Sequence, residues 1–149
     1  MCSSDLHGHG THVAGTIGAV GNNGVGMAGI NWKVRILPVK FLNSSGSGSI
    51  SDAVLGFDLL RQLKLAGENI RVTNNSWGGG GYSLAMHNAI LAARAKGALF
   101  IAAAGNEGPM EGTVGSPANA PLAISVGAVD KKKQLTDYSS RGKPGISGM

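Results

Sequence analysis

Two histidines near the start of the chain are the first residues whose type and spacing suggest chemistry. His9 stands between two glycines in the run Gly8-His9-Gly10-Thr11-His12, so other backbone can approach it closely and its ring can face a cleft. A histidine side chain can take up and return a proton near neutral pH. The segment therefore offers a candidate for proton transfer.

Two other interpretations stay open on this segment alone. His9 and His12 are three residues apart, a spacing at which both could ligate a metal ion. No cluster of histidine, cysteine or carboxylate side chains elsewhere in the sequence completes such a site, which weighs against metal binding. The pair could also be two ordinary histidines at the start of a helix.

The elements that must position these side chains alternate between helices and strands. Helices are predicted at 11–20, at 49–67, where Ser49 and Asp52 form a capping-box pattern, and at 83–96. Strands are predicted at 34–42, 70–74, 99–103 and 124–129, although Pro38 removes one ladder donor from the first. This order predicts an α/β domain with a parallel sheet and right-handed crossovers. Ligands of such sheets bind beyond the carboxyl ends of the strands.

The composition agrees with one packed domain. The 149 residues are 42% hydrophobic and 14% charged, which excludes a disordered chain. The 25 glycines carry no Gly-X-Y period, so a collagen-like chain is excluded as well. Cys2 is the one cysteine and cannot form an internal disulfide.

Charge and hydropathy indicate neither a nucleic-acid partner nor a membrane partner. The net charge is +5, but the basic residues are scattered, and the run Lys131–Lys133 is best explained as a solvated turn. No apolar stretch approaches the length of about 18 residues that a membrane helix needs. We also expect no signal peptide in the chain as given.

Five segments in order along the chain resemble the subtilisin-like serine proteases, the subtilase family. They are His9–Gly15, Asn74–Gly78, Ala102–Gly108, Ser116–Ala118 with Ile124–Ala128, and Tyr138–Gly142. The resemblance implies a three-layer α/β fold, with a mostly parallel sheet and helices on both faces. It also implies that 1–149 is a partial catalytic domain, truncated at both ends.

The resemblance assigns two catalytic roles. His9 would be the general base of an Asp/His/Ser triad. Asn106 would donate a hydrogen bond to the negative charge that develops on a carbonyl oxygen, a role that its neutral amide suits. The alternative for Asn106 is a turn residue that tolerates unusual backbone angles.

The resemblance also assigns a groove for an extended polypeptide. The backbone of Ser76, Trp77 and Gly78 would pair with the substrate. The small residues Ala103 and Gly105 would form the opposite wall of a pocket for the side chain before the scissile bond. Trp77 as a core residue is the alternative. Outside the groove, Ser116–Pro117 would be a cis peptide bond.

The chemistry requires no cofactor. The segment Gly24–Gly29 reads G-x-G-x-x-G, but no strand leads into it, so dinucleotide binding is not favoured. With Asn22 and Asn23, the same loop resembles a calcium-binding loop of many subtilases. A structural calcium ion therefore stays open.

Two members of the triad are missing from this sequence. Eight residues precede His9, and Asp5 matches a non-catalytic position of the family. The family motif Gly-Thr-Ser-Met-Ala is absent, and Ser147 lies too close to Gly142 to be the nucleophile. A further hypothesis is that residues 1–6 are not native, because GTG-TGC-TCT-TCC-GAT-CT, the end of a common sequencing adapter, translates to them if GTG is taken as a start codon.

We therefore expect an internal fragment of a serine endopeptidase that is inactive by itself. The alternative is a catalytically dead subtilase-like module that binds peptides around Trp77. Polypeptide substrates, a monomeric state and secretion are the expectations that the family resemblance adds.

Overall fold

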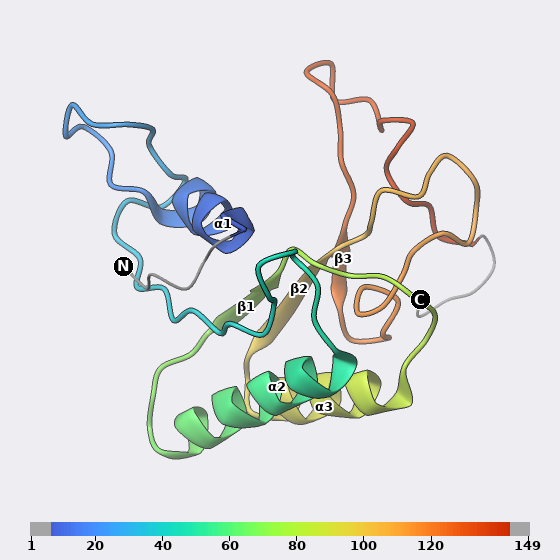
Figure 1. Cartoon of the computed structure of the whole chain (residues 1–149), viewed down its shortest axis with the longest axis horizontal. Helices are drawn as coiled ribbons and strands as arrows, with labels where there is room; N and C mark the ends of the chain where they lie inside the picture. Colours follow the sequence, from blue (N-terminus) through green and yellow to red (C-terminus); the bar gives the residue numbers. More distant parts are fainter. Residues whose placement is uncertain (1–6, 144–149) are drawn as a thin grey trace. The chain divides into compact units, whose positions relative to one another are not determined.

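The computed structural model describes residues 7–143, which form two compact units divided between Gly56 and Phe57 (Figure 1). The elements in chain order are α1 (His9–Gly18), α2 (Ile50–Leu65), β1 (Val72–Asn75), α3 (Leu84–Ala95), β2 (Leu99–Ala103) and β3 (Ile124–Val126). The division falls inside α2. Each unit is therefore described by itself.

The second unit contains a parallel sheet with the strand order β1-β2-β3. Asn75 lies opposite Ala102 in the first pair, and Ala103 lies opposite Val126 in the second. The strands predicted at 70–74 and 99–103 are thus confirmed to within two residues. The strand predicted at 124–129 is shorter, because beyond β3 the chain turns into an isolated antiparallel bridge between Val129 and Leu135.

The strand predicted at 34–42 is wrong, since this segment forms no ladder with any residue between 7 and 143. Pro38 offers no N–H to a partner, and Ile36 and Leu37 are 43% and 53% exposed. Strand preference reflects packing against a neighbouring strand more than an intrinsic backbone preference. The β-branched composition of 34–42 was therefore not sufficient to predict a strand.

Helix α2 begins and ends with the signals that the sequence contains. The Ser49 Oγ accepts a hydrogen bond from the Asp52 N–H at 3.0 Å and donates one to the Asp52 carboxylate at 2.7 Å. At the other end, Gly67 has a φ of +98°, and the N–H of Glu68 reaches the Leu63 carbonyl at 3.0 Å. These contacts satisfy free backbone groups at both ends of the helix.

The core of the second unit lies on one face of the sheet. Phe100 of β2 is fully buried, and its ring centroid is 5.2 Å from that of Phe57 on α2. Helix α3 packs against β2 and buries Met86 and Ile90. In Figure 1, α3 and the part of α2 that belongs to the second unit run beneath the three strands. This arrangement of helices on a parallel sheet confirms the predicted α/β class.

The opposite face of the same sheet is apolar but exposed. Its side chains include those of Val72, Leu99, Ile124 and Val126, which are 43–50% exposed. The burial of β2 therefore alternates along the strand, with Phe100 and Ala102 on the packed face.

We predict that Phe100→Ala lowers the free energy of unfolding by about 3–5 kcal/mol, because it removes a large, fully buried ring. Leu99→Ala, in the same strand, is the matched control and should cost far less, since Leu99 is 43% exposed. Urea denaturation of the purified protein measures both values. Equal losses for the two variants would contradict this placement of the core.

Candidate active site

His9 is the first residue of α1. The helix begins after Gly8, whose φ of +76° is the left-handed conformation that glycine adopts most readily, and the His12 N–H donates to the Gly8 carbonyl at 3.0 Å. The His9 side chain is exposed, and its ring centroid is 6.3 Å from that of His7. Residues 7–143 contain no group of three or more potential metal ligands among His, Cys, Asp and Glu.

Two predicted groove segments lie at the carboxyl ends of neighbouring strands. Ser76–Gly78 follows β1 directly, and Ala103 is the last residue of β2, two residues before Gly105. Because the two strands are parallel and Asn75 pairs with Ala102, both segments leave the sheet at the same edge. This is the edge at which α/β proteins bind ligands.

Asn75 ties these two segments together, a role that the sequence analysis did not identify. Its side chain is buried, and Nδ2 donates to the Ile101 carbonyl at 3.0 Å and to the Thr73 Oγ1 at 3.2 Å. A buried amide whose donors are paired resists displacement. The signal in the sequence was an asparagine at the end of a predicted strand.

The ring of Trp77 packs against the core, and the pairing of its backbone with a substrate stays a prediction. Its side chain is half-buried, with its ring centroid 6.4 Å from that of Phe57, while its backbone continues the segment from β1. The next residues lie close to Ser116: the Gly79 N–H donates to the Ser116 carbonyl at 3.0 Å, and a Cβ on Gly78 would approach that oxygen to 2.9 Å. The predicted cis bond between Ser116 and Pro117 is confirmed.

Asn106 lies in a turn whose backbone is held by the segment 138–140. Gly105 has a φ of +111°, and its carbonyl accepts the Ser140 N–H at 3.0 Å. The Glu107 N–H donates to the Ser140 Oγ at 3.1 Å. One residue further, the Gly108 N–H donates to the Tyr138 carbonyl at 3.0 Å. The Asn106 side chain itself is exposed, at the same edge of the sheet as Ser76–Gly78.

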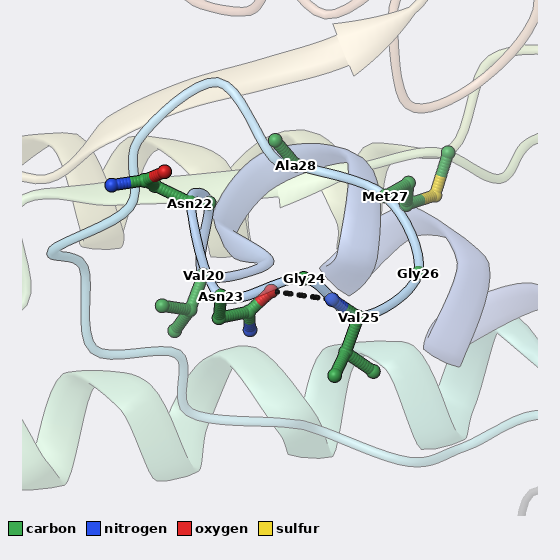
Figure 2. A pocket seen from close by; sticks show the side chains of 9 residues that line it. Val20, Asn22, Asn23, Gly24, Val25, Gly26, Met27 and Ala28 are labelled. Carbon is green, nitrogen blue, oxygen red and sulfur yellow. Dashed lines mark hydrogen bonds between the residues drawn. The ribbon is translucent and has the colours of Figure 1, made fainter.

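A separate cavity of about 160 Å³ lies in the first unit and is lined by residues 20–28 (Figure 2). The Asn23 Oδ1 accepts a hydrogen bond from the Val25 N–H at 3.1 Å, so this side chain shapes the loop. Asn22 is exposed and has a φ of +55°. The oxygen atoms around this cavity that could ligate a metal ion belong to neutral amide side chains and backbone carbonyls.

The predicted site residues thus fall into two groups. Ser76, Trp77, Gly78, Ala103, Gly105 and Asn106 all lie at the carboxyl edge of the sheet in the second unit. His9 belongs to the first unit, so the prediction that His9 and Asn106 face one cleft stays a prediction. Asp5, Ser147 and the segment 1–6, which we suggested is not native, fall outside the described residues.

This architecture defines an α/β protein whose candidate site lies beyond the carboxyl ends of parallel strands. Residues 3–146 match the family model described as "Subtilase family". The chain therefore belongs to the subtilase family.

The relatives that the chain resembles include two subtilisins. Subtilisin DY of Bacillus licheniformis is 40% identical over 97% of this chain and 54% of its own length. Subtilisin Savinase of Lederbergia lenta is 38% identical over 94% of this chain and 49% of its own. Among solved structures, Sphericase superposes with a TM-score of 0.87 at 35% identity, covering 94% of this chain and 47% of that one. The chain thus spans about half the length of the relatives that it matches.

We predict that Gly108→Ala destabilises the protein by about 2–3 kcal/mol, because a Cβ there would lie 2.1 Å from the Ser139 carbonyl oxygen. Gly81→Ala is the matched control. A Cβ on Gly81 meets nothing within 4 Å, so its effect should stay within about 0.5 kcal/mol. Thermal or urea unfolding measures both variants. A neutral Gly108→Ala would show that the turn is not held against 137–140.

Proposed function

We propose that the chain is part of the catalytic domain of a serine endopeptidase that hydrolyses polypeptides. The observation that carries this proposal is the exposed Asn106 amide, on a turn braced at both sides, at the same sheet edge as Ser76–Gly78. A neutral donor on a backbone that is held in place, beside a groove for an extended substrate, suits stabilisation of an oxyanion.

In the proposed reaction, His9 acts as general base. It takes the proton from a serine hydroxyl as that oxygen attacks the peptide carbonyl, and then returns the proton to the leaving amine. The Asn106 amide donates to the oxygen that becomes negative in the tetrahedral intermediate. The serine and the aspartate of the triad would come from parts of the protein that this sequence does not contain.

The groove would hold the substrate in an extended conformation. Backbone pairing along Ser76–Gly78 gives affinity with little demand on sequence. The substrate side chain before the scissile bond would lie between this segment and Ala103–Gly105, where small residues leave room. The Asn75 side chain would keep these two walls in register, since it bonds to β2 from the end of β1.

Other properties of the complete protein follow from the family and are part of the same proposal. We expect secretion and a monomeric state. No helix in the described part of the chain, residues 7–143, is long and apolar enough to span a membrane.

We predict that His9→Ala abolishes nearly all turnover of the complete protein that contains this chain. Asn106→Ala should leave a measurable rate, because one donor is lost while the triad stays intact. In subtilisin itself, removal of one oxyanion donor costs roughly 10²–10³ in kcat, so that figure is a family measurement and not a prediction of ours. Steady-state hydrolysis of a chromogenic peptide measures both variants.

A serine-directed phosphonate probe separates this proposal from its alternative, a catalytically dead peptide-binding module. The complete protein should be labelled at a serine outside the present sequence, whereas the 149-residue chain by itself should not be labelled. Peptide binding without labelling of the complete protein would favour the dead module. Labelling of Ser147 would overturn the proposed roles.

A calcium ion in the cavity at residues 20–28 is a further part of the proposal. The neutral oxygens around it fit calcium, which prefers carbonyl and carboxylate ligands, although no carboxylate lines this cavity. Asn22 and backbone carbonyls would be the ligands from this loop, and the bound ion would hold the loop in place.

We predict that a chelator shortens the half-life of thermal inactivation of the complete protein and that added calcium restores it. Asn22→Ala should reduce this calcium dependence, because it removes one side-chain oxygen. Asn43→Ala, in a different exposed turn, is a control of the same chemistry and should leave the calcium dependence unchanged. A half-life that the chelator does not change would contradict calcium binding.

A further inference from the structure

We propose that Ser140 is a positioning residue that orients Asn106 for its contact with the substrate oxygen. This inference rests on the proposed function, because it gives Ser140 a role only through Asn106. Ser140 does not reach the reacting atoms in this proposal. It acts on the backbone that carries the donor.

Ser140 contacts the peptide groups on both sides of Asn106. Its backbone N–H donates to the Gly105 carbonyl at 3.0 Å, and its Oγ accepts the Glu107 N–H at 3.1 Å. The first group belongs to the peptide unit before the Asn106 Cα, and the second belongs to the peptide unit after it. Holding both units restricts rotation about φ and ψ of Asn106, and so fixes the direction in which its side chain leaves the backbone.

The space around this contact favours serine. Ser140 is 5% exposed, and a Cβ on Gly105 would lie 2.8 Å from the Ser140 Oγ. The acceptor at position 140 must therefore be a short side chain that packs directly against the backbone of Gly105. Alanine at 140 would remove the acceptor of the Glu107 N–H and so release one of the two peptide units beside Asn106.

The neighbouring Ser139 has a different task and is the matched control. It is fully buried, but its Oγ accepts the N–H of Ala128, which lies just beyond β3. Loss of this hydroxyl should weaken the packing of the segment after β3, since it leaves the Ala128 N–H unpaired. The Ser139→Ala substitution leaves the two hydrogen bonds of Ser140, one of its backbone and one of its side chain, in place.

A double-mutant cycle in the complete protein tests the proposal. Ser140→Ala should lower kcat about tenfold and change KM less than about twofold. The reason is that displacement of the Asn106 amide weakens its hydrogen bond mainly in the transition state. In the Asn106→Ala background, Ser140→Ala should change kcat less than about twofold, since residues that act through one group are not additive. Ser139→Ala should change kcat by the same factor in both backgrounds.

The possible results separate this inference from the proposed function. If Asn106→Ala leaves kcat unchanged, the proposed oxyanion role fails, and the inference fails with it. If Asn106→Ala lowers kcat while Ser140→Ala has no effect, or has the same effect in both backgrounds, the inference alone is overturned. Should Ser140→Ala not fold, Ser140→Cys, a weak acceptor of similar shape, takes its place in the cycle with the same criteria.

Discussion

The parallel pairing of β1 with β2 is the interaction on which the candidate site depends. Parallel strands end at the same edge, so the register that places Asn75 opposite Ala102 also places the segments after them side by side. The buried Asn75 amide bonds across this pair to the Ile101 carbonyl. The register of the two strands and the relative position of the segments that follow them are therefore set by the same contacts.

The chain beyond β3 also supports the turn that carries Asn106. Thr136 and Ser139 bond back to Ala128, and this returns the segment 138–140 to the turn that follows β2. Two segments 33 residues apart in the sequence thus meet at the turn that carries Asn106. The turn keeps its conformation through contacts between backbone groups and small polar side chains, which tolerate little extra volume.

The sequence predicted much of the fold and the sheet edge at which most of the candidate site residues lie. Helical spacing and end signals such as Ser49 and Gly67 were local, so α2 was predicted to within two residues. The prediction of a strand at 34–42 was wrong because a strand forms only where it can pair with a neighbouring strand, and composition does not show that neighbour. Ser140 was missed as a positioning residue for a similar reason. Its role comes from a contact 33 residues away in the sequence, to Glu107.

In the turn around Asn106, the contacts that hold the backbone are distinct from the side chain that we propose acts on the substrate. Its backbone is held by hydrogen bonds of Gly105, Glu107 and Gly108 to residues 138–140, whereas the Asn106 side chain makes no hydrogen bond to residues 7–143. The conformation of the turn is thus held by contacts that do not involve the side chain at position 106. Position 106 is therefore suited to protein design. Other hydrogen-bond donors can be placed on this preformed turn without redesign of the loop that carries them.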